Sequence, residues 1–583
     1  MARYTPPGSL NSVLAINAEL EKISEAFQDT VSRKNDSPNQ MEGDLDLNGN
    51  SLLNVQSSPD KPNSVVFRKE VYTKEETDEL LEENREYTDV REANIRADFS
   101  EGITGATVVV YPDVASLEAS EPTQTGQRAE VVETGGQYIT ADVSYTPIAG
   151  DYTAGNGRIW RLVGGSVKTD LTVGIPSDFD TLQDAVNYYH NRVRFVEGFS
   201  LILNIGAGHQ PSIGVSVSNG DYSYIRITSD DTEVPLAPSF TGSFIVGSNC
   251  NMPRLECLIN AGGYCENGYY AENSRGFVLT GCGVKNAGFH GLYANSASNV
   301  VAGGSIFTGA SQSTPAYSGI LSWGSTVDAY GADVSGSLYY GAQAAAGGSL
   351  YFRDGIANNC ARHAVRATNL ALTVARDVSA LNAGVTGVRA FDGGMVHADG
   401  IDVSGSVVGF WAENKSEIHC KGSTCNNTSG LAMYASGTSK IYAEGFNGVD
   451  CVAGLSSISS HIDVTNCVFS TTGATLVTVR NAGKVIAEAC DMSHNSTSVG
   501  VDLDEASEFL ANAANIDVPN ARLLQAAQFC RINLSRSTCT YTAGNGINLT
   551  SGCHCNVAGS NILETDVNGM FFNTVYGRGI CYG

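Results

Sequence analysis

Apolar and polar residues alternate with two different periods along this chain. Near the start, apolar positions in residues 10–34 are spaced three and four apart, which predicts an amphipathic helix with one apolar stripe. Residues 73–99 are charged and helical in pattern, with a polar seam typical of a weak coiled coil. From residue 106 onward, short runs alternate apolar and polar residues between turns rich in Gly, Ser and Asn. The pattern therefore predicts a mainly β chain with helical segments near its start.

The alternating part repeats itself from residue 268 onward, with a period of about 22 residues. Each repeat holds a first strand, a turn, a second strand, another turn and a short third strand. The repeats begin at Gly268, Gly291, Gly319, Gly341, Ala364, Gly387, Gly409, Gly430, Gly454, Leu476 and Val499. A period of about 20–30 residues with strand alternation is typical of a β-solenoid, and the regular leucine scaffold of leucine-rich repeats is absent. We therefore expect a right-handed parallel β-helix whose turns stack ~4.8 Å apart.

The alternation also predicts which side chains point outward. In the first strand, the inward residues should be Val388, Phe410, Leu431, Ala390 and Ala412. One outward column of the first strand is Tyr270, Tyr293, Leu321, Gln343, Arg366, Arg389 and Trp411. Its neighbour is Glu272, Asn295, Trp323, Ala345, Thr368, Phe391, Glu413 and Tyr434. The outward columns of the second strand are Asp328, Tyr351, Val374, His397, His419 and Tyr442, and beside them Tyr330, Arg353, Arg376, Asp399, Lys421 and Glu444.

Five regions follow from these patterns. They are residues 1–70, a helical or coiled-coil neck at 71–105, a small β domain at 106–166, the parallel β-helix at 167–545, and a distal turn and tip at 546–583. A helix at 177–195, with capping-box spacing between Ser177 and Asp180, should cover the open end of the solenoid.

Composition narrows the classes of function. The chain has 583 residues, 64 of them glycine, and a net charge of −26, so long-range repulsion argues against nucleic acid as a partner. The chain contains no run of 18 apolar residues, so the sequence predicts no segment that spans a membrane. The 15 cysteines are irregularly spaced and are best interpreted as small buried thiols, with a zinc site at Cys553, His554 and Cys555 as the alternative. We expect no metal and no other cofactor.

The segment GDLDLNGNSLLNV at residues 43–55 carries a resemblance to a known family. It resembles the GDLDMNGN element in the virion-anchoring domain of tail fibres and tailspikes from short-tailed bacteriophages. The segment DFDTLQDAVNYY at residues 178–189 is similar to the helix that opens the β-helix of pectate-lyase-like phage spikes. The resemblance implies a homotrimer made in the host cytoplasm and carried on the virion. Residues 1–70 would then attach to phage tail or portal-adaptor proteins.

Candidate chemistry lies on the outer face of the first strand. The candidate substrate-binding residues are Trp323, Arg366, Arg389, Phe391, Trp411 and Tyr434. Aromatic rings stack on sugars and arginine forks bind acidic groups, so these residues favour a host surface glycan. Burial against a sister chain in the trimer is an equally good interpretation, because interfaces are also rich in aromatic residues and arginine. On the second strand, Arg353 and Arg376 begin a column of alternating charges that reads as a structural ion ladder or as a site for an acidic saccharide.

The candidate catalytic residues have no motif behind them. Glycoside hydrolysis usually needs two carboxylates, and a polysaccharide lyase needs a base. Asp399, Glu413 and Glu444 supply carboxylates on facing or nearby strands of adjacent turns, and His397 could act as a base beside Asp399. The sequence therefore favours a tailspike that recognises and degrades host polysaccharide. A non-enzymatic receptor-binding fibre and a structural adaptor for another spike stay open as alternatives.

Overall fold

The protein is described by a computed structural model that covers residues 108–141, 144–313, 316–541, 546–564, 570–573 and 581–582. The helix expected at 10–34, the predicted neck at 71–105 and the virion-anchoring segment at 1–70 lie outside the described residues. No helix among the described residues is long and apolar enough to cross a membrane.

A small sheet comes first in the described chain. Its strands run in the order β1-β2-β3-β5-β4, and β7 pairs with β5. Trp160 and Leu117 are fully buried in it, and the indole nitrogen of Trp160 donates a hydrogen bond to the Ser120 hydroxyl at 2.9 Å. The elements are β1 (Val109–Tyr111), α3 (Val114–Glu118), β2 (Arg128–Val131), β3 (Gly136–Thr140), β4 (Tyr152–Thr153), β5 (Ile159–Val167) and β7 (Arg194–Phe195).

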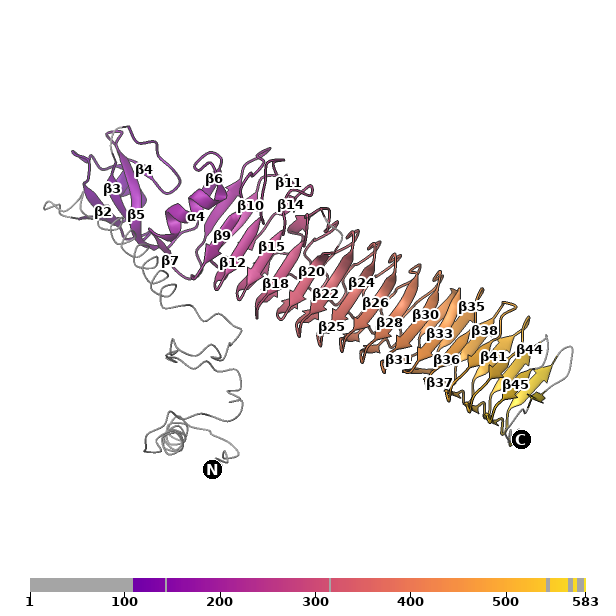
Figure 1. The fold of residues 1–583 in the computed structure, drawn as a ribbon. Helices are drawn as coiled ribbons and strands as arrows, with labels where there is room; N and C mark the ends of the chain where they lie inside the picture. The colour runs from indigo at the N-terminus through magenta and orange to yellow at the C-terminus, as the bar shows by residue number, and fades with distance from the viewer. Residues whose placement is uncertain are drawn as a thin grey trace, which may run out of the picture. The chain divides into compact units, whose positions relative to one another are not determined.

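The rest of the described chain winds into a parallel β-helix, as the repeat predicts (Figure 1). The first strands of successive turns form a 16-stranded parallel sheet, here called the first sheet. Its strands are β9 (Val215–Ser218), β12 (Ile245–Ser248), β15 (Tyr269–Glu272), β18 (Leu292–Asn295), β20 (Ser318–Trp323), β22 (Tyr340–Ala345), β24 (His363–Thr368), β26 (Thr386–Phe391), β28 (Val408–Glu413), β30 (Leu431–Ser436), β33 (Ala453–Ile458), β36 (Val477–Arg480), β39 (Val501–Leu503), β42 (Leu524–Ala526), β45 (Ile547–Thr550) and β48 (Met570–Asn573).

The second strands form the second sheet, which is also parallel throughout its described pairings. Its strands are β6 (Leu171–Ile175), β8 (Leu201–Ile205), β10 (Ile225–Ser229), β13 (Asn251–Leu255), β16 (Arg275–Val278), β19 (Asn299–Val301), β21 (Thr326–Asp328), β23 (Ser349–Tyr351), β25 (Leu372–Val374), β27 (Met395–His397), β29 (Glu417–His419), β31 (Lys440–Glu444), β34 (His461–Thr465), β37 (Lys484–Glu488), β40 (Glu508–Leu510), β43 (Arg531–Asn533), β46 (His554–Asn556) and β49 (Cys581–Tyr582).

The third strands fall into two groups joined by isolated bridges, from Gly283↔Ile306 to Thr424↔Asn447. They are β11 (Val234–Pro235), β14 (Leu258–Asn260), β17 (Gly283–Lys285), β32 (Asn447–Cys451), β35 (Val468–Thr471), β38 (Asp491–His494), β41 (Asn515–Val518), β44 (Thr538–Tyr541) and β47 (Asn561–Glu564).

The register confirms most of the predicted orientation. Val388, Ala390, Phe410 and Ala412 are fully buried, whereas Leu431 is not. Phe410 pairs with Met433, so the predicted column is two residues out of step at this turn. The cause is the first strand β30, which begins later after its glycine than its neighbours do. Each such large apolar side chain, fully buried, contributes about 1.5–3 kcal/mol to folding.

The helix at the start of the solenoid is shorter than predicted. α4 spans Leu182–His190 rather than 177–195, and Thr181 is its N-cap, accepting a hydrogen bond from the Asp184 backbone at 3.1 Å. The predicted cap at Ser177 is wrong because Asp178 instead accepts a hydrogen bond from the Gly174 backbone at 2.6 Å. That contact holds the segment before Thr181 in a turn. The face of α4 that carries Leu182, Ala185, Val186 and Tyr189 is buried.

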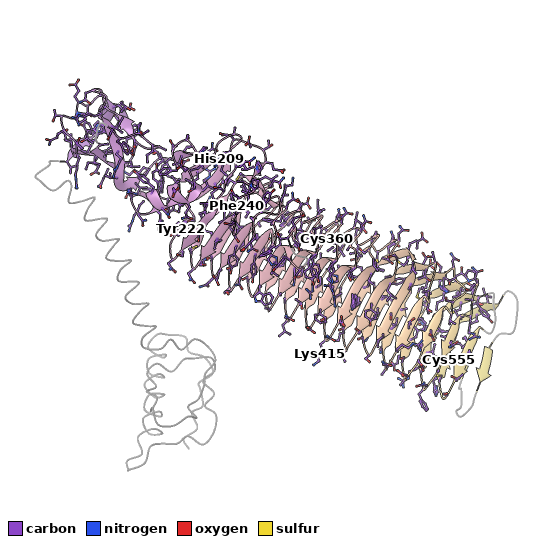
Figure 2. All side chains as sticks on the ribbon, turned by 45° about the horizontal axis from the view of Figure 1, so that its top comes forward. His209, Tyr222, Phe240, Cys360, Lys415 and Cys555 are labelled. Carbon is purple, nitrogen blue, oxygen red and sulfur yellow. The ribbon has the colours of Figure 1, made fainter. Side chains whose placement is uncertain are left out.

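The cysteines follow the length of the solenoid and pack into it. Of the 14 that the structure describes, all are free thiols and all but Cys282 are buried. Cys360 lies midway along the β-helix and Cys555 near its far end (Figure 2). Strand alternation buries Cys553 and Cys555 but leaves His554 exposed on the outer face. The three side chains therefore do not converge, and the zinc alternative is wrong.

Candidate functional site on the first sheet

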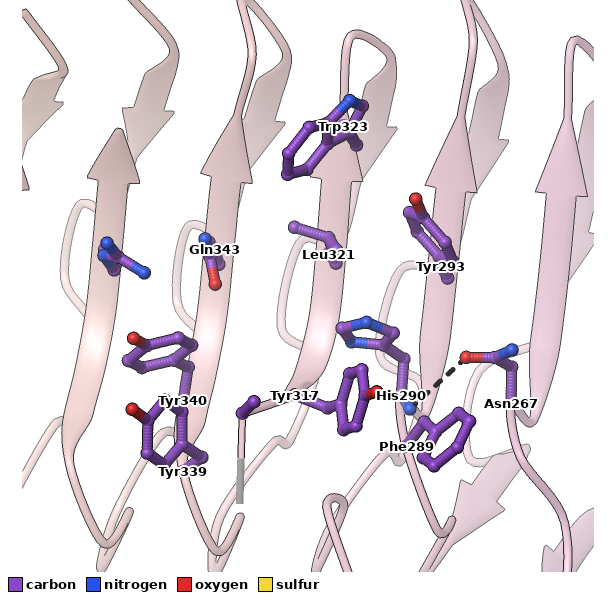
Figure 3. A pocket seen from close by; sticks show the side chains of 12 residues that line it. Asn267, Phe289, His290, Tyr293, Tyr317, Leu321, Trp323, Tyr339, Tyr340 and Gln343 are labelled. Atoms are coloured by element: carbon purple, nitrogen blue, oxygen red, sulfur yellow. Dashed lines mark hydrogen bonds between the residues drawn. The ribbon is translucent and has the colours of Figure 1, made fainter. Parts of the chain in front are cut away.

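An aromatic cleft lies on the outer face of the first sheet, over its fourth to seventh strands. It has a volume of about 440 Å³ and crosses the strands β18, β20, β22 and β24. Figure 3 shows Tyr317, Phe289, Tyr339 and Tyr340 gathered at the starts of these strands and Trp323 at the end of β20. The lining residues are Asn267, Phe289, His290, Tyr293, Ala316, Tyr317, Leu321, Trp323, Tyr339, Tyr340, Gln343 and Arg366.

Ring contacts hold the walls of the cleft in place. Phe289 stacks on Tyr317 with ring centres 4.4 Å apart, and Tyr339 contacts Tyr340 at 4.3 Å. Behind them, the buried His290 accepts a hydrogen bond at Nδ1 from the Ser318 backbone at 3.0 Å. Burial lowers the pKa of His290 to about 3, so this imidazole is neutral at physiological pH. Trp323 stays 43 % exposed, which leaves its ring face open to a ligand.

Three arginines follow the cleft along the same face. Arg366 and Arg389 are direct partners on β24 and β26, and Arg362 precedes β24. Arg366 lies over the Tyr340 ring at 4.6 Å, and Arg389 lies over the Trp411 ring at 4.6 Å. Such cation–π contacts orient the guanidinium groups but leave their in-plane donors available.

A buried histidine lies behind the arginines. His363 Nε2 is 3.0 Å from an Arg389 nitrogen, and its ring is stacked on Tyr340 with centres 5.3 Å apart. Burial, with the charges of Arg389, Arg366 and Arg362, lowers the pKa of His363 to about 2. The imidazole therefore contributes no charge, and the site remains a cluster of cations around a neutral ring.

The predicted binding residues lie together on this face. Trp323 and Arg366 line the cleft, and Arg389 and Trp411 continue the column of Arg366. Phe391 occupies the neighbouring column, where the Arg389 guanidinium lies 5.1 Å from its ring centre.

One assignment to a column is corrected. Tyr434 pairs with Trp411, at 5.3 Å between ring centres, and Ser436 rather than Tyr434 pairs with Glu413. This is the same two-residue offset at β30 that leaves Leu431 outside the core.

The predicted catalytic residues do not come together. Glu413 ends β28 on the first sheet, where it accepts a hydrogen bond from Arg389 at 3.0 Å. Asp399 and Glu444 belong to the outer face of the second sheet, in ion pairs with Arg376 at 3.4 Å and Lys421 at 2.8 Å. The structure thus places Glu413 on the first sheet and the other two carboxylates on the second, as the predicted outward columns require, and the two sheets face different directions.

His397 lies on β27 of the second sheet and stacks on His419, with ring centres 4.9 Å apart. Burial lowers the pKa of His397. The two ion pairs confirm the predicted ladder at Arg376 and Lys421. Asp377 follows Arg376 in the sequence, but it is a turn residue. Its φ of 54° is the left-handed conformation that Asp tolerates.

Sequence reasoning missed a second carboxylate cluster on the first sheet. Arg480, at the end of β36, contacts Asp502 at 2.5 Å and Asp504 at 3.1 Å. Burial raises the pKa of Asp502, although the charge of Arg480 opposes the shift. Asp502 lies in the outward column of Trp411 and Tyr434, through Ser456 and Thr478. This column is about 19 Å long from Trp411 to Asp502 at ~4.8 Å per strand.

Sequence reasoning also missed the cleft-lining residues Tyr317, Tyr339 and Tyr340, although two features of the sequence mark them. The step of 28 residues from Gly291 to Gly319 is the longest in the repeat, and this insertion supplies Tyr317 to the cleft. Adjacent aromatic residues at Tyr339 and Tyr340, just before the turn's first strand, mark the opposite wall.

Comparison with known proteins adds the following. No protein-family model matches this chain, and no curated protein matches it. Among solved structures, it is similar to the full-length tailspike protein 2 from Escherichia coli O157:H7 bacteriophage CAB120, at 14% identity and a TM-score of 0.22 over 74% of this chain and 51% of that one. The enzymatically active domain of tailspike protein 2 from bacteriophage CBA120 matches at 14% identity and a TM-score of 0.22, over 68% of this chain and 57% of that one.

A third similar structure is tailspike protein gp49 of Acinetobacter baumannii bacteriophage Fri1, a capsular polysaccharide depolymerase. It matches at 9% identity and a TM-score of 0.18, over 81% of this chain and 76% of that one. The chain spans about half the length of the first full-length tailspike it matches. At these scores the alignments do not superimpose residues, so the site stands on its own geometry.

Proposed function

We propose that this chain is one subunit of a phage tailspike that binds a bacterial surface polysaccharide along the outer face of the first sheet and cleaves it. The observation that carries the proposal is the continuous row on that face. An aromatic cleft leads to three arginines, then to Trp411 and Tyr434, and finally to Asp502 and Asp504. Aromatic rings cover the apolar faces of sugars, and arginines bind their polar groups bidentately. The resemblance of residues 1–70 to a virion-anchoring domain supports the location on a phage tail.

For cleavage, Asp502 and Asp504 are the pair that the geometry favours. Glycoside hydrolysis commonly needs one protonated and one ionised carboxyl group, whose environments hold their pKa values apart. Burial raises the pKa of Asp502, which suits a general acid, and Arg480 holds both side chains at one place. Glu413 is the second candidate, because it lies on the same face. Asp399, Glu444 and His397 remain candidates only for a site on the second sheet.

We also propose that three chains assemble side by side. The second sheet carries exposed apolar side chains at Phe277, Val301 and Met395, which a sister chain would cover. Such an arrangement leaves the first sheet open to polysaccharide. Light scattering of the full chain should then give three times the 61.3 kDa chain mass.

Digestion of purified capsules and lipopolysaccharides tests the proposed activity. The full-length protein should release new reducing ends, or unsaturated uronate absorbance if the reaction is an elimination. Asp502→Asn should reduce cleavage, and Asp399→Asn, on the second sheet, should leave it unchanged. Loss of activity in Asp399→Asn with full activity in Asp502→Asn would move the site to the second sheet.

A receptor-binding fibre without catalysis is the second candidate. It is favoured by one observation: among the described residues, no carboxylate lines the aromatic cleft itself. Binding to a panel of surface polysaccharides with no new chain ends after prolonged incubation would support this alternative. Binding to another tail protein, with no affinity for polysaccharide, would instead support the adaptor role.

A further inference from the structure

Arg366 is a cation that forms no ion pair with the described chain. Its strand partner Arg389 and the neighbouring Arg362 are cations that act on it electrostatically, and the charge of Asp392 opposes them without forming an ion pair. Arg389 is paired with Glu413, whose carboxylate is 3.0 Å away. Among the described residues, Arg366 has no ion pair at all, and its defined contact is with the Tyr340 ring. Like charges side by side on a sheet are destabilising, so this arrangement calls for an anion.

Hydrogen bonding gives a second, independent indication. Arg366 Nε, Arg389 Nε and Trp411 Nε1 are buried N–H donors that have no acceptor among the described residues. They belong to three consecutive strands and to one outward column. Arginine and tryptophan nitrogens donate and never accept, so a ligand that satisfies this row must carry acceptor oxygens.

The place of Arg366 decides what kind of anion fits. Its side chain lines the aromatic cleft, beside the exposed ring of Trp323 and the rings of Tyr339 and Tyr340. A sugar ring stacked in the cleft would present substituents to the guanidinium, and a carboxylate matches the arginine fork with two parallel hydrogen bonds. The chain carries a net charge of −26, so this cluster is a local exception to an acidic surface.

We infer that Arg366, flanked by Arg362 and Arg389, is a carboxylate-binding subsite, and that the polysaccharide is acidic, with a uronic or other carboxyl-bearing sugar in the cleft. The inference rests on the proposed polysaccharide function and specifies its substrate class. Arg366 makes the contact with the carboxylate. Arg389 is held by Glu413 and positions the neighbouring donors.

A panel of bacterial capsular polysaccharides of known composition, acidic and neutral, provides the test. The full-length protein should bind acidic members, and chemical reduction of the carboxyl groups of a bound polysaccharide to alcohols should weaken binding about ten-fold or more. Arg366→Gln should weaken binding to the native polysaccharide by a similar factor and leave binding to the reduced form unchanged. Arg366→Lys should recover part of the loss, because it keeps the charge without the fork.

Arg194→Gln, at an exposed arginine on β7 of the small sheet, is the matched control and should bind like the wild type. The inference is overturned if the wild type binds native and reduced polysaccharide equally, or if Arg366→Gln weakens both by the same factor. In that case the polysaccharide function still stands. Failure of the wild type to bind any member of the panel overturns the function itself. If Arg366→Gln instead disperses the trimer, the anion belongs to a sister chain, which also overturns the inference.

Discussion

The first and second sheets come from the same repeat, but the cationic side chains on their outer faces differ in whether they have carboxylate partners. On the second sheet, Arg376, Lys421 and Lys484 each lie within ion-pair distance of a carboxylate one turn away, at 3.4, 2.8 and 3.3 Å. On the first sheet, Arg389 is paired, but the half-buried Arg366 has no carboxylate partner among the described residues.

This difference suggests that the paired charges of the second sheet have a structural role and that Arg366 on the first sheet has a functional one. Exposed ion pairs contribute little to stability, and they keep an acidic solenoid from repelling itself between turns. A half-buried arginine with no partner destabilises the free protein. The carboxylate ligand that we infer would compensate this cost in the complex.

The largest expected effect concerns catalysis. Asp502→Asn should lower the rate of polysaccharide cleavage by about 10²–10⁴-fold, because the variant loses a proton-transferring group. Asp463→Asn, an acidic position on the second sheet, should cleave at the wild-type rate. End-group assays under identical conditions compare the two. Equal loss in both variants would show that the sheets do not divide structure from function as described.

The two matched ion pairs should differ in stability. Glu413→Gln should lower the free energy of unfolding by about 1–2 kcal/mol, because it leaves the half-buried Arg389 without its carboxylate. Glu444→Gln should cause no measurable change, because its partner Lys421 is solvent-exposed. Denaturant titration of both variants measures the difference. A Glu444→Gln effect as large as that of Glu413→Gln would contradict it.

The buried histidine should make stability fall in acid. Above pH 6.5 His363 is neutral in both states, but below it the unfolded chain binds a proton that the folded site rejects until about pH 2. Each pH unit of acidification below 6.5 should therefore remove about 1.4 kcal/mol of stability through this residue. Thermal unfolding of wild type and His363→Gln between pH 7 and pH 5 should show a shallower dependence in the variant. Parallel curves would show that His363 is protonated in the folded protein.

The smallest expected effect concerns Trp323, whose exposed ring lines the cleft. Trp323→Ala should weaken polysaccharide binding about ten-fold, roughly 1.4 kcal/mol, and change unfolding by no more than about 0.5 kcal/mol. Tyr351→Ala, in an outward column of the second sheet, should not affect binding. Calorimetry with a polysaccharide that the wild type binds distinguishes them. An unfolding change above 1 kcal/mol in Trp323→Ala would show that the ring is structural.

The repeat could be aligned from sequence because strand alternation has a fixed period of two. The column from Tyr270 to Trp411 is confirmed at every turn, since one residue of slip would bury its charges. The prediction failed at β30, where Leu431 is only partly buried and Met433 takes the inward place. A shift of two residues keeps the alternation intact, so the apolar pattern alone does not detect it.

The sequence by itself determined the parallel β-helix, the identity of its outward columns and the aromatic and cationic character of one face, because these depend on local periodicity. Only the tertiary structure decided that Phe410 pairs with Met433, that Tyr317 from an insertion meets Phe289, and that Arg480 gathers Asp502 and Asp504. These facts depend on how sharply the chain turns between strands and on which side chains neighbouring turns bring together. The periodicity of the sequence carries no information about either of these.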